Sequence, residues 1–153
     1  MGENKDNLVL KHKNEFKKFK IKVREQIERP LLKKLLPTGS VLTGLFTEKH
    51  DGKLTFGRQI GSYPLLVGIP GVFELHEFVD VKVVDYGYRS ITAVPYPLDI
   101  NTAPRQTIEA IPGIGKKRAI RILANRPFKS KEELAESLDD EEASRELLKF
   151  VKI

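Results

Sequence analysis

Two glycines separated by a single residue, Gly113 and Gly115, interrupt a stretch with helical periodicity, and this spacing strongly limits how the chain can fold. Glycine reaches positive φ at little cost, and without a Cβ it leaves neighbouring backbone N–H groups accessible. Ile114 lies between them and can turn inward to hold the loop against a core. Lys116 and Lys117 follow at the start of a helix, where the helix dipole favours anions. The segment therefore predicts a rigid turn that can hold a phosphate group.

The positive charge of the chain lies in two blocks. The net charge is +6 over 153 residues, with a pI near 9.5. Residues 1–36 hold 11 Lys/Arg against 5 Asp/Glu, and residues 99–130 hold 7 against 2. Residues 37–98 are nearly neutral at −1, and residues 131–153 are acidic at −4. Two basic blocks indicate a binding footprint. The alternative is that the N-terminal lysines only solvate a helix.

Composition removes several function classes. The 153 residues contain no cysteine, so they supply no disulfide, thiolate ligand or cysteine nucleophile. No apolar run approaches the roughly 20 residues of a membrane helix, and the lysine-rich N-terminus is no secretory signal. His12, His50 and His76 are too scattered for a metal site, and no catalytic triad order is evident. We therefore expect a cytoplasmic protein that is not an enzyme by itself.

The first of three predicted parts is a basic helical segment, residues 1–37. Residues 1–11 are polar and are predicted to be loose. Residues 13–28 are predicted to form a helix, because apolar residues recur there every three or four positions. Pro30 is predicted to break this helix and to open a second, short one. The recurring apolar residues are Phe16, Phe19, Val23 and Ile27.

The second part, residues 38–98, is predicted to be a small β-barrel. Five short strands in about sixty residues are too few for a sandwich, and closure removes the exposed edges. The segment Pro95-Tyr96-Pro97 is a stiff connector that predicts a fixed orientation toward the helices that follow. The fold class is thus α+β. The expected strands are 41–48, 53–58, 63–68, 78–86 and 90–94.

The third part, residues 99–153, returns to helical periodicity. Thr102 is predicted to cap the helix that precedes the glycine turn. Ser130 begins a capping box for a later helix. Asp139 or Asp140 is predicted to cap the last one, so caps and first turns account for the acidic charge at this end.

The run Ile-Pro-Gly-Ile-Gly-Lys-Lys at 111–117, with the Phe-x-Ser at 128–130, resembles a helix-hairpin-helix module of the kind found in competence-type DNA-binding proteins. The resemblance implies binding of a nucleic-acid backbone without base readout. The N–H groups of Gly113 and Gly115 would hold one phosphate. The residues that it assigns to the nucleic acid are Gly113, Ile114, Gly115, Lys116, Lys117, Arg118 and Arg121.

The same resemblance implies a monovalent cation held by the backbone carbonyls of Glu109, Ile111 and Ile114. No other cofactor is expected. The alternative is a hairpin kept only as a joint between two helices. Lys116 and Lys117, with two arginines after them, make the segment more cationic than a joint requires.

The barrel segment resembles the TRAM-type RNA-binding barrel, an OB-like module, through Gly57-Arg58, Tyr63–Gly68, the run 75–84 and the return at 89–91. The resemblance implies phosphate and base contacts on the barrel. The alternative is that the aromatic side chains fill the barrel or its base. The candidate contact residues are Arg58, Tyr63 and Arg89, with Phe56, Tyr86 and Tyr88 as further aromatic candidates.

Residues 24–138 together resemble the C-terminal part of a large group of archaeal radical-SAM proteins. The shared runs are Gly57–Gly68 and Val-Pro-Tyr-Pro-Leu-x-x-Asn-x-Ala at 94–103. These residues cannot bind the iron–sulfur cluster of radical-SAM proteins, because they include no cysteine. The chain is therefore either an excised C-terminal fragment or a stand-alone relative.

These observations predict a non-catalytic protein that recognises the phosphate backbone of nucleic acids, with RNA (tRNA included) favoured over DNA and no membrane partner. One alternative is a C-terminal substrate-binding fragment of a radical-SAM RNA-modifying enzyme, which needs a catalytic partner domain or protein. The other is a protein-interaction module whose basic helix docks an acidic partner.

Overall fold

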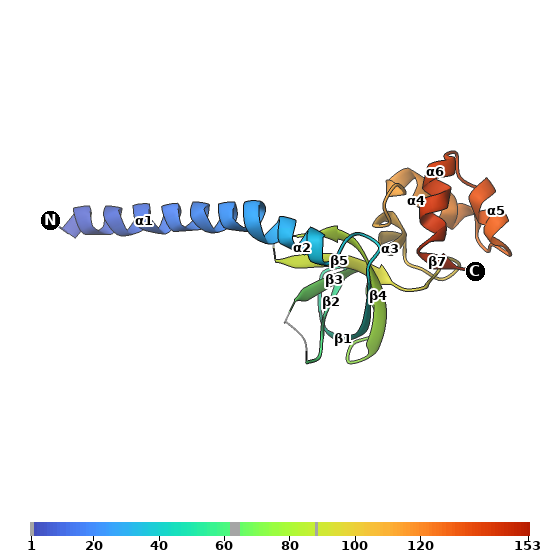
Figure 1. Ribbon diagram of the computed structural model, residues 1–153, viewed down its shortest axis with the longest axis horizontal. Coiled ribbons are helices and arrows are strands. Elements are labelled where there is room, and N and C mark those ends of the chain that lie inside the picture. The colour runs from blue at the N-terminus through green and yellow to red at the C-terminus, as the bar shows by residue number, and fades with distance from the viewer. Residues whose placement is uncertain (1, 62–64, 88) are drawn as a thin grey trace.

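The computed structural model describes residues 2–61, 65–87 and 89–153, with side chains described from residue 10 onward. Within these residues a long N-terminal helix leads into a closed five-strand barrel, and a group of short helices follows (Figure 1). The fold is α+β, as predicted. None of the described helices is both long and apolar enough to cross a membrane.

The N-terminal segment is one continuous helical rod that projects away from the barrel (Figure 1). It comprises α1 (Gly2–Val23), the π-helical turn η1 (Arg24–Glu28) and α2 (Arg29–Leu35). Residues 2–11 are helical, against prediction, and Pro30 does not interrupt the rod, although it does begin a second, short helix as predicted. The Arg29 N–H bonds to the Arg24 carbonyl, which widens the turn just before Pro30. Pro30 then lies in the first turn of α2, where its missing N–H is tolerated.

The barrel closes in the strand order β1-β2-β3-β5-β4, with β4 returning to β1. The β3–β5 pair is parallel and the other pairs are antiparallel. Alternate residues of each strand face the interior, among them Leu45, Val67 and Val81, all nearly or fully buried. The strands are β1 (Val41–Asp51), β2 (Leu54–Gln59), β3 (Leu66–Pro70), β4 (Phe78–Tyr86) and β5 (Ser90–Pro95).

The C-terminal helices surround the glycine turn. Ser130 and Asp140 cap α5 and α6 as predicted: the Ser130 hydroxyl accepts from Glu133 N, and the Asp140 carboxylate accepts from Glu142 N and Ala143 N. Thr102 does not cap α3, whose N-cap position is occupied by Pro104. The elements are β6 (Leu98–Asp99), α3 (Arg105–Glu109), α4 (Gly115–Asn125), α5 (Lys131–Glu136), α6 (Glu141–Leu148) and β7 (Val151–Lys152), with β6 and β7 paired in parallel.

The barrel and the C-terminal helices share a hydrophobic core. Val84 and Val94, from two barrel strands, belong to the same buried cluster as Ile108 and Ile122 of the helices. The buried hydroxyl of Thr107 on α3 donates to the Pro70 carbonyl at the end of β3, at 2.5 Å. Lys82 Nζ donates to the Lys149 carbonyl at 2.6 Å. Barrel and helices therefore hold one fixed orientation, as the proline-rich connector predicts.

Candidate nucleic-acid interface

The turn between α3 and α4 has the tight backbone that its sequence predicts. Gly113 and Gly115 have φ values of +83° and +63°, in the region that side chains rarely adopt. Ile111 and Ile114 are 1% and 3% exposed and belong to the shared core, so they hold the turn from inside. Ile114 N donates to the Ile111 carbonyl at 3.1 Å, which closes the turn. A Cβ on Gly115 would meet nothing within 4 Å, so space does not require a glycine there. The positive φ does.

Lys116 and Lys117 lie exposed in the first turn of α4. No side-chain cap hydrogen bond is made at the N-cap residue Ile114, so the first N–H groups of α4 have no side-chain acceptor. Among the described residues, neither lysine has a hydrogen-bond or ion-pair partner. Two free ammonium groups beside the positive end of a helix form an arrangement that favours an anion.

Arg118, predicted to contact the nucleic acid, has partners within the protein. Its Nη1 donates to the Gly113 carbonyl at 2.6 Å, its Nε lies 3.1 Å from Asp139 and its Nη2 lies 3.2 Å from Asp140. The guanidinium thus ties the hairpin to the segment between α5 and α6 and is committed inside the module. Arg121 lies 3.4 Å from the same Asp139 carboxylate but is more exposed, so it remains at the surface.

The Asp139 carboxylate is the partner that sequence reasoning missed, because the acidic residues were interpreted only as helix caps. The hydrogen bond from Arg118, together with a backbone hydrogen bond and the charge of Arg121, lowers the pKa of Asp139 below its usual range. The sequence signal for this ion pair was Arg118 and Arg121, three positions apart, with the pair Asp139-Asp140 later in the chain. Nothing in the spacing between 121 and 139 showed that the chain would return there.

The predicted cation-binding carbonyls belong to this same hairpin. The Ile111 carbonyl already accepts from Ile114 N, and the Glu109 side chain bonds to Arg105 at 2.6 Å. Over the part of the chain that is described, no three His, Asp or Glu side chains gather as a metal site. The cation at Glu109, Ile111 and Ile114 stays a prediction.

The candidate contact residues on the barrel have different structural settings. Arg58 lies exposed on β2, 3.9 Å from Glu48. Arg89 forms a close ion pair with Glu28 of the N-terminal rod, with 2.8 Å between Nε and Oε2. Tyr86 was expected at the surface but is only 8% exposed, because its ring fills the barrel core and its hydroxyl donates to the Leu36 carbonyl. Tyr63 and Tyr88 lie outside the described residues, and Phe56 is half-buried.

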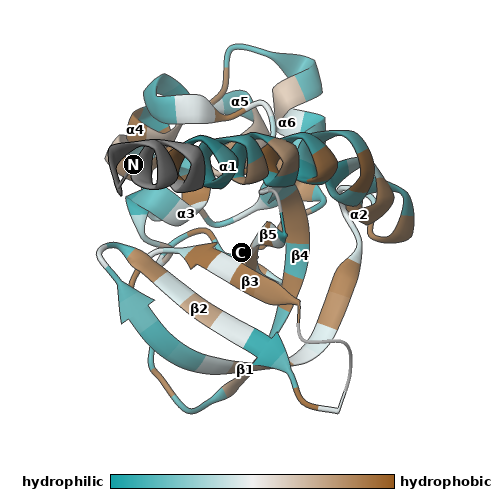
Figure 2. Ribbon diagram, turned by 90° about the vertical axis from the view of Figure 1, so that its left-hand side faces the viewer, coloured by the Kyte–Doolittle hydropathy of each residue, from teal (hydrophilic) through white to brown (hydrophobic). Residues whose placement is uncertain are grey.

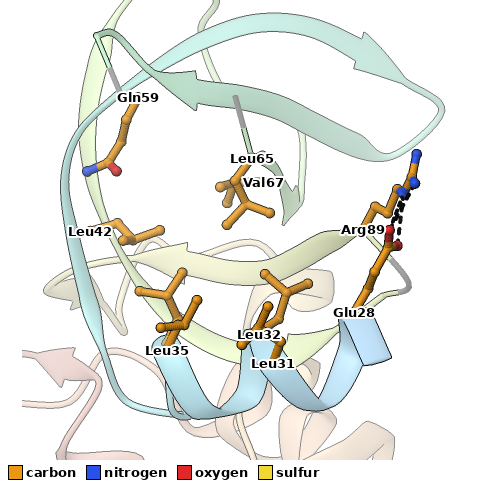
Figure 3. Close-up of a pocket in the computed structure, with 10 residues that line it drawn as sticks. Glu28, Leu31, Leu32, Leu35, Leu42, Gln59, Leu65, Val67 and Arg89 are labelled. Carbon is orange, nitrogen blue, oxygen red and sulfur yellow. Dashed lines mark hydrogen bonds and ion pairs between the residues drawn. The ribbon is translucent and has the colours of Figure 1, made fainter. Parts of the chain in front are cut away.

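Arg89 and Glu28 lie at the rim of a cavity of about 790 Å³ between α2 and the end of the barrel (Figure 3). Arg89 lowers the pKa of Glu28, first by its hydrogen bonds and then by its charge. The walls are otherwise mostly apolar, and Figure 3 shows side chains from α2 facing side chains from the barrel strands. The apolar lining residues are Leu31, Leu32, Leu35, Leu36, Leu42, Leu65 and Val67.

The rod itself leaves large apolar side chains in solvent. Figure 2 shows hydrophobic residues alternating with hydrophilic ones along α1 and α2. Phe19 is 63% exposed and Leu35 is 66% exposed. Lysines lie among them, with Lys20 Nζ 4.6 Å from the ring centroid of Phe16. Leu31 and Leu35 line the cavity against the barrel, whereas Phe16 and Phe19 lie further along the rod and are more than half exposed. The exposed apolar residues of the rod are Leu10, Phe16, Phe19, Ile21, Ile27, Leu31 and Leu35.

Residues 97–139 match the family of helix-hairpin-helix motifs, which are generally a nucleic-acid-binding kind of module. Over 144 residues, 94% of this chain, the sequence is 42% identical to an uncharacterized protein of Archaeoglobus fulgidus, of which this covers 26%. A stretch of 84 residues is 55% identical to an uncharacterized protein of Methanocaldococcus jannaschii, covering 54% of this chain and 16% of that protein. The chain thus spans about a quarter or less of these relatives. No solved structure matches.

Proposed function

We propose that this protein binds nucleic acid through the phosphate backbone, with the hairpin at 111–117 as the principal contact. The observation that carries the proposal is the pair of unpartnered lysines in the first turn of α4, directly after two glycines that expose the backbone. A phosphate placed there would meet helix N–H groups and two ammonium groups together. The contact requires no base, so it predicts recognition of backbone shape and charge over sequence.

The preferred ligand in this proposal is RNA, with tRNA as the first candidate. The barrel supports this choice, since it has the closed five-strand form of OB-like modules, which bind single-stranded nucleic acids. The resemblance of the barrel segment to the TRAM-type barrel also favours RNA. The lysines of α1 would extend the electrostatic track away from the hairpin. The protein performs no chemistry by itself in this proposal.

The test is a fluorescence polarisation titration with tRNA, single-stranded RNA and duplex DNA, each at two salt concentrations. We expect log K to fall with log salt by about 0.7 to 0.9 for each phosphate contacted. The Lys116→Glu/Lys117→Glu variant should bind all three ligands more weakly and with a shallower salt slope. Gly113→Asp should do the same, because it strains the positive φ and adds a negative charge to the turn.

A matched control separates local contact from overall charge. Lys131→Glu/Lys152→Glu changes the net charge by the same amount at two other exposed lysines of the C-terminal module. If the hairpin and control variants lose affinity equally, the binding reflects only net charge and the hairpin clamp is rejected. RNA preference is rejected separately, if duplex DNA competes as well as tRNA at the higher salt.

The lengths of the relatives favour a second candidate function. An alignment of 144 residues that is 26% of the Archaeoglobus protein means that this relative has about 550 residues. We propose, as the alternative, that this chain supplies the substrate-binding end of a larger radical-SAM RNA-modifying system. Its own 153 residues contain no cysteine, so the cluster ligands would come from another polypeptide region.

The exposed apolar side chains of the N-terminal rod would suit docking to a catalytic partner of this kind. They would equally suit docking to an acidic protein, which is the related alternative. Phe16 and Phe19 are both more than half exposed among lysines, which would suit a partner surface with apolar and acidic groups. The test is co-purification with a catalytic partner encoded nearby, using the parent and a Phe16→Ser/Phe19→Ser variant. Equal recovery of the partner with both proteins would rule out the rod as the contact.

A further inference from the structure

A row of side chains crosses three strands on the outside of the barrel. Phe46 of β1 is paired with Arg58 of β2 on one side and with Phe78 of β4 on the other. Directly paired residues project from the same face of a sheet. The neighbours of Phe46 along β1, Leu45 and Thr47, are buried in the barrel. Arg58, Phe46 and Phe78 therefore lie side by side on the outer face.

The rings of this row form a cluster with His76. The Phe46 and Phe78 centroids are 5.2 Å apart with the rings tilted by 56°, and the Phe46 and His76 centroids are 6.1 Å apart. Such tilted contacts are favourable for aromatic pairs. Phe78 nevertheless remains 66% exposed. A large aromatic side chain held by its neighbours with most of its surface in water is poised to contact something else.

The backbone at His76 adopts a conformation that non-glycine residues take uncommonly. His76 has φ +60° and is the only described non-glycine residue with a positive φ. The segment is held by Thr47, which is 2% exposed: its carbonyl accepts from His76 N at 2.8 Å, and its hydroxyl donates to the Glu74 carbonyl at 2.9 Å. Glu77 N donates back to the same hydroxyl at 3.1 Å. Strain that surrounding structure enforces in this way tends to mark functional surfaces.

The charges around the rings are of both signs. Arg58 lies 3.9 Å from Glu48 on the neighbouring strand, and Glu77 adjoins His76. A second ring, Phe56, lies beside Lys49, whose Nζ is 5.9 Å from its centroid. Opposite charges offer no net attraction for phosphate, so the surface presents ring faces and a guanidinium plane. Those are the groups on which nucleobases stack.

We infer that Phe46, Phe78 and His76, with Arg58 at the end of the row, form a stacking platform for unpaired bases. The inference rests on the proposed nucleic-acid binding and names its ligand as single-stranded. The hairpin would supply phosphate contact that any strand satisfies, and the platform would supply contacts that a duplex cannot make, because its bases are already stacked. A protein partner on this face is the alternative occupant, and the test below tells the two apart.

The experiment compares oligonucleotides with equal phosphates but different bases. The probes are a single strand of about 12 nucleotides, the same strand with abasic sites at its centre, and a blunt duplex of that length. Phe78→Ala should weaken binding of the intact strand about five-fold or more. It should leave affinity for the abasic strand and the duplex unchanged, and the salt slope should stay that of the parent.

Two further variants serve as controls. Leu35→Ala removes an apolar side chain that is also 66% exposed, but on α2 and outside the aromatic row, and should leave all three affinities unchanged. Phe78→Trp restores a ring, and because the chain contains no tryptophan, its fluorescence reports position 78 alone. Quenching by the intact strand, and not by the duplex, is the expected result.

The outcomes separate this inference from the proposed function. If Phe78→Ala leaves the intact strand bound as before, or weakens the abasic strand equally, the platform is overturned and its rings serve sheet packing or a protein partner. If the Lys116→Glu/Lys117→Glu variant loses affinity in the same experiment, the hairpin proposal survives that failure. If the Phe78 effect is seen and the lysine effect is not, the platform stands and the hairpin clamp fails.

Discussion

The two basic regions of the chain have similar charge and very different structural settings. Residues 1–36 have a net charge of +6 and residues 99–130 a net charge of +5. The first region is a helical rod that projects from the barrel and meets it at α2 (Figure 1). The second is built on the core that barrel and helices share. The same excess charge is thus spread along a solvated rod in one place and concentrated on a fixed turn in the other.

Two of the four arginines in the second region hold backbone carbonyls inside the module. Arg118 binds the Gly113 carbonyl and two aspartates, and Arg126 donates to the carbonyls of Ile100 and Ala103. Lys116 and Lys117 are left facing solvent. The comparison teaches that a charge count locates a basic region but does not identify the contact residues. In this module Arg118 and Arg126 hold the backbone in place, whereas Lys116, Lys117 and Arg121 are exposed to a ligand.

The largest expected effect is a difference in the free energy of unfolding between a substitution in the hairpin region and one in the rod. Ile111→Ala removes a side chain that is 1% exposed beneath the hairpin, so we expect the free energy of unfolding to fall by about 2–5 kcal/mol. Phe19→Ala on the rod removes a side chain that is 63% exposed and should change it by less than about 0.5 kcal/mol. Urea denaturation followed by circular dichroism measures both. Equal losses would mean that the rod is packed against something in solution.

The next comparison is of affinity. Lys116→Glu/Lys117→Glu and Lys17→Glu/Lys18→Glu remove the same charge from the hairpin and from α1. We expect the hairpin variant to lose about ten- to a hundred-fold in affinity for single-stranded RNA, with a salt slope shallower by about 0.7 to 0.9 per lost contact. The α1 variant should lose only a few-fold, through longer-range attraction that salt screens. A reversed order would place the main contact on the rod.

A smaller effect is expected where the helices are attached to the barrel. Thr107→Val keeps the shape of a fully buried side chain and removes the hydroxyl that donates to the Pro70 carbonyl. Leaving that acceptor without its donor should reduce the free energy of unfolding by about 1–3 kcal/mol. The Arg89→Met variant, which breaks the exposed contact of the rod with the barrel, should move the denaturation midpoint much less. A single transition in both variants would keep barrel and helices as one unit.

Local sequence signals accounted for much of this fold. The hairpin was predictable because both glycines, the inward isoleucines and the caps at Ser130 and Asp140 act over a few residues. Strand β4 was placed correctly at 78–86 by its alternation of apolar and polar residues. The continuity of the rod through Pro30 was not predicted. Proline usually ends a helix, and the π-helical turn before it leaves no recognisable pattern in the sequence.

The site residues that sequence reasoning missed depend on contacts between distant segments. Phe46 and Phe78 are 32 positions apart and meet only through the β1–β4 register. Nothing local in the sequence showed that Asp139 would return beside Arg118. Tyr86 was expected to be exposed, yet α2 lies over the barrel end and its Leu36 carbonyl accepts from the Tyr86 hydroxyl. Aromatic and basic residues identified candidates, and only the fold assigned their roles.

The smallest expected effect concerns pH and the frame of the hairpin. The Arg118 hydrogen bond lowers the pKa of Asp139, so the folded protein favours the ionised carboxylate. Its contribution to stability is therefore complete above the ordinary Asp pKa of about 3.9 and is lost as pH falls through the lower, folded value. Arg118→Met should be less stable than the parent at neutral pH, and the difference should shrink below about pH 4. Urea titrations at several pH values measure it. A difference that stays constant into acid would show that Arg118 acts through the Gly113 carbonyl alone, and that the aspartates of the α5–α6 connection do not hold the hairpin.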